Sequence, residues 1–346
     1  MNKHVFLITA ALAASLCGVG CNKSGKLNEP SKGTAPTGPV ELKLKWTVGE
    51  RVLQNIGMKI NMEISGTNLP GAINQDMVLG EDYALNVLSA DAAGGHELEM
   101  EFLGIRMTMD QGGKTLIDYD SAKKSSSGAG NPALAGVDKM FQNIVGAKIH
   151  FYLNPSNRVE RVEGFDTLMN KMTAAGQAQA MDSMKSLFSE ESLKQMIGGQ
   201  NLPTKPVQPG DSWPMQTDIA MGNLGTMALD YTFNFARWET HGVRNCARLE
   251  FQGTMKTKGK PEAAGGVALS VQDGDSSGVA WFDPELGLVV ETRMNQNMNV
   301  NMTVPMPGRK NATQGMTMVM KQDVTMKVES VKRCRQFRPE LSGGKI

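Results

Sequence analysis

The residue types most suggestive of chemistry lie in residues 274–278, which read GDSSG and match the G-x-S-x-G pattern of a serine nucleophile. That chemistry needs the serine on a strand-to-helix turn and a later histidine that acts as the base. Residues 279–282 instead read as a strand, and no histidine follows His241. The segment is rich in residues that tolerate turns. The sequence therefore predicts a hairpin turn here and no catalytic residues.

The same segment also resembles the first half of a calcium-binding loop. Asp273, Asp275 and Ser277 have the alternate spacing of its oxygen ligands, and a glycine occupies the sixth position. Pro284 stands at the twelfth position, where a closing glutamate is required, and Glu285 comes one residue late. These three residues are therefore candidates for a weak calcium site only. No cofactor is predicted.

Methionines at alternate positions are the most unusual chemical feature, since the chain has 25 Met in 346 residues. Three readings stay open: an ordinary strand core, a groove for an apolar ligand, or a thioether site for Cu(I). The groove interpretation follows because flexible thioether side chains can adapt to apolar ligands of varied shape. The candidate groove residues are Met294, Met298, Met302, Met316, Met318 and Met320.

The cysteines of the chain after residue 21 are Cys246 and Cys334. Strand alternation places Cys246 on a polar face with Arg248 and Glu250, so its thiol is expected to face solvent. An exported protein could join the two in a disulfide, and two free thiols are the alternative. The spacing supports neither a redox pair nor a zinc site.

The N-terminus has the pattern of an export signal with a lipid anchor. Residues 1–20 hold one lysine before an uncharged apolar run over residues 5–19, too short for a comfortable membrane span. Small residues precede Cys21, the predicted lipidation site. Residues 21–39 are rich in Pro, Gly, Ser and Thr and are expected to form a flexible tether. The protein is thus predicted to be lipid-anchored and periplasm-facing, with Asn22 slightly favouring the outer membrane.

Composition sets the broad class. Lys+Arg is 36 and Asp+Glu is 35, giving a net charge of +1, and hydrophobic residues make up 40%. These values are those of a globular protein and exclude a polytopic membrane protein or a disordered chain. A near-zero charge also argues against nucleic-acid binding, which needs a basic face.

A period of two dominates from residue 40 onward and predicts a mainly β fold of antiparallel sheets with one polar face. Several landmarks recur in order: the Asp-Tyr pair at 82 and 230, the Glu-Phe pair at 101 and 250, and the Asx-Pro pair at 154 and 283. We therefore predict two tandem related antiparallel units, 40–162 and 203–334, with a short α-helical segment at 163–202 and a tail at 335–346. Residues 112–146 read as an inserted loop.

These motifs, together with residues 44–50 and 209–213, resemble an exported, lipid-anchored bacterial β-rich family classed as a domain of unknown function. The strand-helix-strand layout is also loosely similar to the lipoprotein-carrier fold, a curved sheet closed by helices. Because the shared motifs are turns and strands, the resemblance implies no site residue.

The sequence thus favours a non-catalytic envelope lipoprotein that acts as a binding or scaffold module. One alternative is a carrier that holds a lipid or another apolar molecule in the methionine-lined groove. A second alternative is a weak metal-binding protein. The expected partner is a membrane, which the protein reaches through its lipid anchor. The sequence does not predict a protein partner, an oligomeric state or the identity of a ligand.

Overall fold

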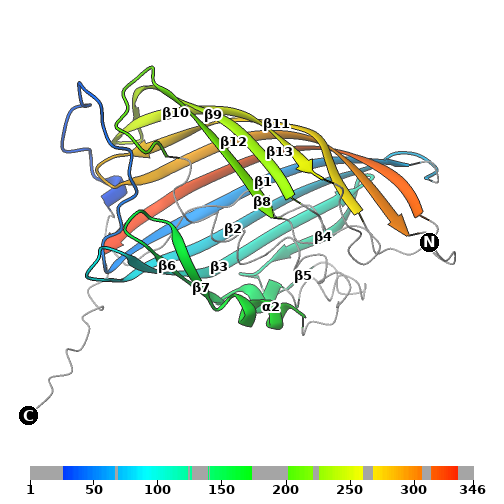
Figure 1. Ribbon diagram of the computed structural model, residues 1–346. Coiled ribbons are helices and arrows are strands. Elements are labelled where there is room, and N and C mark those ends of the chain that lie inside the picture. Colours follow the sequence, from blue (N-terminus) through cyan, green and yellow to red (C-terminus); the bar gives the residue numbers. More distant parts are fainter. Residues whose placement is uncertain are drawn as a thin grey trace, which may run out of the picture.

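The computed structural model describes residues 26–66, 69–123, 125–126, 139, 141–173, 202–220, 226–259, 268–305 and 313–333. The predicted signal segment, Cys21 and Cys334 lie outside these residues. The described part is dominated by long strands that curl around one apolar face (Figure 1).

The elements follow in the order 3₁₀ turn η1, strands β1 to β7, helix α2 and strands β8 to β13. Their bounds are η1 Lys26–Asn28, β1 Glu50–Gly66, β2 Ile73–Ala90, β3 His96–Gln111, β4 Lys114–Asp120, β5 Ser125–Ser126, β6 Lys148–Leu153, β7 Val159–Glu163, α2 Phe165–Thr173, β8 Ser212–Ala220, β9 Thr226–His241, β10 Arg244–Lys258, β11 Ala268–Asp283, β12 Leu288–Pro305 and β13 Thr313–Arg333.

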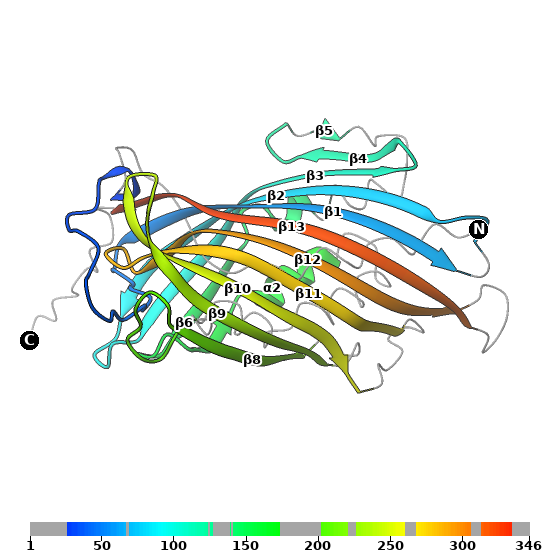
Figure 2. The ribbon, with the colours of Figure 1, turned by 90° about the horizontal axis from the view of Figure 1, so that it is seen from above.

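All these strands belong to one antiparallel sheet. Its order is β5-β4-β3-β2-β1-β13-β12-β11-β10-β9-β8, and β6 pairs with both β3 and β7. The mainly β prediction is confirmed, but the prediction of two tandem sheet units is wrong. The reason is the pairing of β1 with β13 along its whole length, from Glu50 opposite Arg333 to Gly66 opposite Met316. Figure 2 shows these two strands side by side in the middle of the sheet.

The recurring landmarks fall on strands that pair in the same succession on both sides of the β1–β13 pair. Strands β1, β2, β3, β6 and β7 pair in order, as do β8 to β12. The Asx-Pro landmarks both form turns, since Asn154 Oδ1 accepts from Arg158 N at 3.1 Å and Asp283 Oδ1 from Leu286 N at 3.1 Å. Whether the two successions are copies of one unit stays a prediction.

The period of two separates the two faces of the sheet. In β1, alternate residues from Val52 to Ile64 are buried, all of them apolar except Gln54, and the residues between them are more exposed. The buried residues of the other strands join them in one continuous core on the concave face. The convex face carries the polar residues, many in cross-strand pairs such as Asn61 to Asp76 at 2.6 Å.

An extended segment, residues 40–46, caps one end of the curled sheet. Val40 pairs with Val207, just before β8, while Lys45 N donates to Gly287 O at 3.0 Å in the β11–β12 turn. Asn157, in the β6–β7 turn, donates from Nδ2 to Leu44 O at 3.2 Å. The side chains of Leu42, Leu44 and Trp46 alternate into the core. Gly287 allows this approach, because a Cβ there would lie 2.4 Å from the Lys45 side chain.

Part of the predicted flexible tether packs on the convex face instead. Residues 26–33 lie against the β9–β10 and β11–β12 turns, where Ser31 Oγ accepts from Asn245 N at 2.7 Å. Arg244 holds this contact: its Nη1 donates to Glu29 O at 2.9 Å, and its Nε pairs with Asp283 Oδ2 at 2.5 Å. Asp283 is fully buried, so the ion pair is shielded from solvent.

Cys246 is fully buried, which corrects the predicted solvent-facing thiol. It does share the convex face with Arg248 and Glu250, as alternation requires, but this end of the face is covered. Cys246 packs with Trp281 and Val290 under Leu27 and Leu286, two partly buried residues from η1 and the β11–β12 turn. Cys246 forms no disulfide with a described residue, and Cys334, the other cysteine of the open disulfide prediction, lies outside the described residues.

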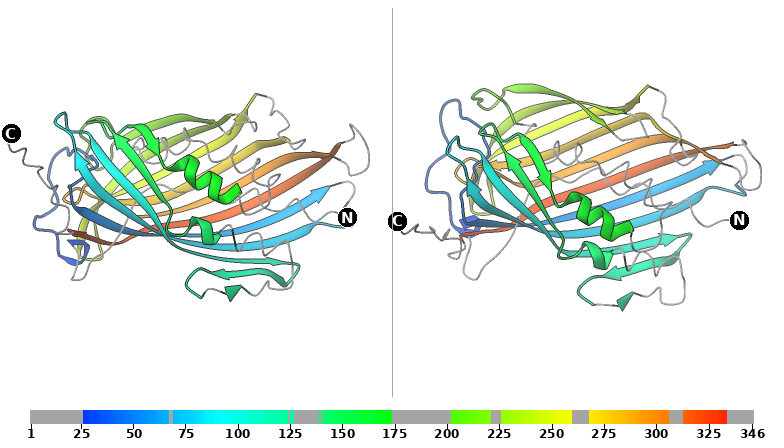
Figure 3. Two further views of the ribbon diagram at one scale, coloured as in Figure 1. Left: turned by 90° about the horizontal axis from the view of Figure 1, so that it is seen from below. Right: turned by 60° about the horizontal axis from the view of Figure 1, so that its bottom comes forward.

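Two further predictions concern the segments between strands. Helix α2 occupies the start of the predicted helical segment and turns Leu168 and Met169 into the core on the concave side (Figure 3); the rest of that segment lies outside the described residues. The predicted loop at 112–146 is partly wrong, because β4 pairs with β3 there and buries Ile117 and Tyr119.

We expect Arg244→Ala to destabilise the fold by ~3–5 kcal/mol, because it leaves the buried Asp283 carboxylate without its cation. Chemical denaturation of the purified chain measures this. The matched control is Lys258→Ala, which breaks the exposed Lys258–Asp218 pair and should cost less than ~1 kcal/mol. Equal effects from the two variants would contradict a structural role for the buried pair.

We expect the Cys246 thiol to be inert in the native protein. Burial raises its pKa to about 12, so the reactive thiolate is scarce at neutral pH. A thiol reagent should label no cysteine in folded Cys334→Ser protein that starts at residue 22, and one cysteine after unfolding in guanidinium. Rapid labelling of the folded protein would show that residues 26–33 do not cover the site.

Candidate functional site

The concave face is lined by the methionine rows that the sequence singled out. Met298 lies directly opposite Met320, and Met302 opposite Met316, on the adjacent strands β12 and β13. Met318 lies between Met316 and Met320 on the same face, and Met294 is partly buried beside them. The structure therefore brings all six candidate groove residues together.

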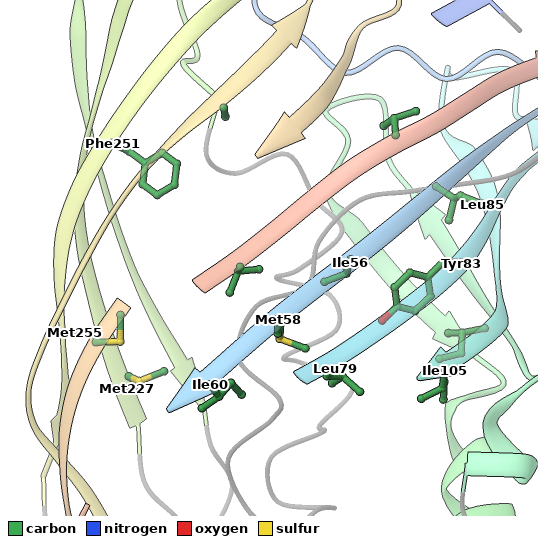
Figure 4. Close-up of a cluster of buried hydrophobic side chains, with 14 of the residues drawn as sticks. Ile56, Met58, Ile60, Leu79, Tyr83, Leu85, Ile105, Met227, Phe251 and Met255 are labelled. Atoms are coloured by element: carbon green, nitrogen blue, oxygen red, sulfur yellow. The ribbon is translucent and has the colours of Figure 1, made fainter. Parts of the chain in front are cut away.

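The apolar lining continues across the sheet on both sides of these strands. Figure 4 shows side chains of β1, β2, β3, β9 and β10 directed to the same concave side. The labelled residues are Ile56, Met58, Ile60, Leu79, Tyr83, Leu85, Ile105, Met227, Phe251 and Met255.

One row of this face is polar. Tyr231 on β9 lies opposite Gly253 on β10, and Gly253 lies opposite Ser276 on β11. Ser276 in turn lies opposite Gln296 on β12, and Gln296 lies opposite Gln322 on β13. Ser276, Gln296 and Gln322 are 2%, 5% and 2% exposed. We call the side chains of Tyr231, Ser276, Gln296 and Gln322 the polar row.

Tyr231 reaches into this row because Gly253 leaves room for its ring. A Cβ on Gly253 would lie 2.6 Å from the ring of Tyr231, so the ring covers the glycine and its hydroxyl extends toward Ser276 and Gln296. These two neighbours favour the ionised form, but burial dominates and raises the pKa of Tyr231. The row is therefore uncharged at neutral pH.

Several oxygen atoms on the concave face have no hydrogen-bond partner among the described residues. They include Oε1 of Gln322 in the polar row and Oε1 of Gln75 on β2. Oε1 of Gln296 and Oγ of Ser276 lie beside the Tyr231 hydroxyl, which has one proton to donate between them. The carboxamide nitrogens are directed to methionine sulfur, as from Gln322 Nε2 to Met58 Sδ at 3.5 Å. A buried acceptor without a partner costs ~1–3 kcal/mol, so these atoms differ from an ordinary apolar core.

A carboxyl group also lies on this face. Glu81, on β2, stands between Ile56 and Ile105 of the neighbouring strands and accepts a hydrogen bond from the Tyr83 hydroxyl. Burial raises the pKa of Glu81 above its ordinary value, and the Tyr83 hydrogen bond only partly opposes this effect. Opposite Tyr83 lies Gln54, both of whose amide atoms lack a partner among the described residues.

The candidate calcium residues do not converge. Residues 273–278 lie inside strand β11, so the predicted hairpin turn is wrong, and the strand extends without the wrap of a calcium loop. Asp273 and Asp275 each accept a hydrogen bond at 2.9 Å from Asn299 and Asn297 on the convex face. Ser276, the serine of the G-x-S-x-G pattern, faces the opposite side of the sheet.

The described residues contain no group of three or more His, Cys, Asp or Glu side chains placed to hold a metal ion. Within the same part of the chain, no helix is long and apolar enough to cross a membrane.

The polar row and Glu81 were missed by the sequence reasoning, although a signal was present. Gln296 and Gln322 stand at apolar positions of the alternating methionine strands, where a core residue is expected. Glu81 gives the same signal, because it stands between Leu79 and Tyr83 at an alternate, otherwise apolar position of β2.

Similar solved structures include lipovitellin, at 7% identity over 84% of this chain and 26% of that chain, with a TM-score of 0.43. This chain thus spans about a quarter of lipovitellin. A putative exported protein with a YmcC-like fold from Bacteroides fragilis is 12% identical over 85% of this chain and 100% of that one, with a TM-score of 0.28. A putative outer membrane lipoprotein-sorting protein domain from Vibrio parahaemolyticus is 9% identical over 83% and 87%, with a TM-score of 0.13. At such scores these likenesses carry no functional argument.

No curated protein matches this chain. A family profile does match, over residues 93–289, which is more than half of the 346 residues. This match confirms the resemblance to a family without an assigned function. The chain belongs to the family described as "Family of unknown function (DUF6263)".

Proposed function

We propose that this protein is a non-catalytic binding protein that holds a lipid or a similarly apolar molecule on the concave face of its sheet. The observation that carries the proposal is the combination of a continuous apolar lining with buried polar acceptors that lack partners among the described residues. A tightly filled core satisfies such acceptors or replaces them by apolar groups. A ligand with both apolar and polar parts supplies what is missing.

The layer structure supports this role. The described segments whose side chains join the core on the concave side include the capping segment 40–46, residues 141–147 and α2. On β13 the apolar row from Met316 to Val328 is roughly 40 Å long at the usual strand rise. Each methylene group of a ligand buried there contributes about 0.8 kcal/mol, and methionine side chains can adapt to its shape.

We further propose that the chain is exported and anchored through Cys21, as its N-terminal sequence predicts. Cys21 is five residues before Lys26. A fully extended chain of that length places the two residues at most roughly 18 Å apart. Since residues 26–33 pack against the β9–β10 and β11–β12 turns, the anchor would hold that end of the sheet near the lipid surface. This arrangement supports a role in the cell envelope.

Native mass spectrometry of residues 22–346, exported with a cleavable signal, tests the binding role. We expect a native mass several hundred daltons above the denatured mass, because an apolar ligand acquired in the cell remains trapped. An excess of a few tens of daltons that a chelator removes would favour the metal-binding alternative instead. Equal masses, with no fluorescence gain from the apolar dye diphenylhexatriene, would overturn the proposal.

Filling the concave face should separate a binding chamber from a packed core. We expect Met298→Trp to reduce diphenylhexatriene binding severalfold while the unfolding midpoint of the ligand-free protein stays unchanged. In a packed core the same change would cost ~1–3 kcal/mol through overpacking. The control is Val319→Trp on the convex side, where Val319 is 41% exposed, and it should change neither quantity. Destabilisation by Met298→Trp alone would argue for a filled core.

The Glu81 carboxyl should make stability depend on pH. Because its pKa is raised in the folded protein, the folded state binds more protons than the unfolded state above about pH 4.5, and stability falls as pH rises through the folded pKa. We therefore expect Glu81→Gln to be more stable than the parent at pH 8 and similar at pH 4, by chemical denaturation. Glu63→Gln, on the exposed face of β1, is the control and should show no such change. A Glu81→Gln difference independent of pH would contradict the raised pKa.

A further inference from the structure

We propose that the polar row selects a neutral ligand with a hydrogen-bond donor between two apolar portions, such as a secondary amide or an internal hydroxyl. This inference rests on the proposed function, because it assigns the chemistry of the ligand on that same face. It depends on three features of the row: the type of its free atoms, the absence of charge beside it and its position along the strands.

The free atoms of the polar row are chiefly acceptors. Gln296 Nε2 is directed to Met294 Sδ at 3.6 Å, and Gln322 Nε2 to Met58 Sδ at 3.5 Å, so each carboxamide turns its oxygen away from these contacts. The oxygen of Gln322 has no partner among the described residues, whereas Gln296 and Ser276 both lie beside the Tyr231 hydroxyl, whose single proton can satisfy only one of them. An N–H or O–H group satisfies them, whereas an ester or ether oxygen cannot.

The surroundings of the row disfavour a charged ligand. Its neighbouring row on one side holds Met255, Met298 and Met320, and the row on the other side holds Phe251, Met294 and Val324. A carboxylate or ammonium group here would lose its hydration without a counter-ion from these residues. A carboxylate would also share the concave face with the acidic Glu81.

The position of the row fixes where the donor lies in the ligand. Apolar residues continue beyond it in both directions on β13, from Met316 to Met320 on one side and from Val324 to Val328 on the other. A terminal headgroup would leave one of these stretches uncovered. A donor within the chain lets apolar portions cover both.

Four ligands of similar length test this: N-octyl octanamide, octyl octanoate, hexadecane and hexadecanoate. Each competes with diphenylhexatriene for delipidated protein of residues 22–346. We expect the amide to bind roughly tenfold more tightly than the ester, equivalent to about 1.4 kcal/mol, because the two differ only in the N–H donor. The ester and the alkane should bind similarly, and hexadecanoate least.

Variants then assign the preference to the polar row. Gln296→Met and Gln322→Met keep the side-chain volume but remove the acceptor, so each should bring the amide-to-ester ratio close to one while ester binding stays unchanged. Their ligand-free stability should equal or exceed that of the parent, since a buried unsatisfied group is removed. Val319→Met, on the exposed convex face of β13, is the control and should keep the preference. Ser276→Ala is a smaller change in the same row and should reduce the ratio if either glutamine variant fails to fold.

The outcomes separate the two proposals. If no ligand displaces the dye and the dye itself does not bind, the proposed function fails. If all four ligands bind but amide and ester bind equally, or hexadecanoate binds best, the function stands and the assignment of the polar row is overturned. A preference for the amide that survives Gln296→Met and Gln322→Met would also overturn it.

Discussion

The architecture depends on the antiparallel pairing of β1 with β13. These strands lie about 250 residues apart in the chain, yet their register places Met62 opposite Met320 and Ile60 opposite Gln322. A slip of one residue would turn the methionines of β13 to the convex side, because strand side chains alternate. The concave face therefore exists as one surface only after the first and last long strands have met, and this non-local contact carries the main loop-closure cost of the fold.

The convex face helps to specify the register of the neighbouring strands β11, β12 and β13. Asparagine side chains of β12 donate to acidic residues of its two neighbours: Asn297 to Asp275 at 2.9 Å on β11, and Asn295 to Asp323 at 2.5 Å on β13. A shifted strand would separate these pairs, and directly opposed polar pairs are worth about 0.2–1 kcal/mol each. Because the solvent side fixes the register, the concave side is free to carry side chains that do not satisfy one another, as Gln296 and Gln322 show.

Much of this arrangement was predictable from the sequence because alternation is a local property. The methionine strands, the Asx-Pro turns and the helix at Phe165 follow from the spacing of residues. The single sheet was not predictable, since no local pattern indicates that β1 pairs with β13. Cys246 shows the same limit. The side of the sheet that it faces was predicted correctly, but residues 26–33, which bury its thiol, belong to a distant segment whose composition suggests disorder. Residues 273–278 were misread because glycine and aspartate favour turns until neighbouring strands pair with them.

In the proposed binding role, the buried acceptors connect stability with binding. Each unsatisfied oxygen costs ~1–3 kcal/mol in the ligand-free protein, an amount comparable to a sizeable part of a domain's net stability. The long strand ladders can sustain this cost, since their backbone hydrogen bonds do not involve the side chains of the polar row. A ligand that donates to Gln296 and Gln322 removes part of the cost and binds only the folded state, so it stabilises the fold by mass action. The same side chains that weaken the empty sheet would thus determine which ligand stabilises it.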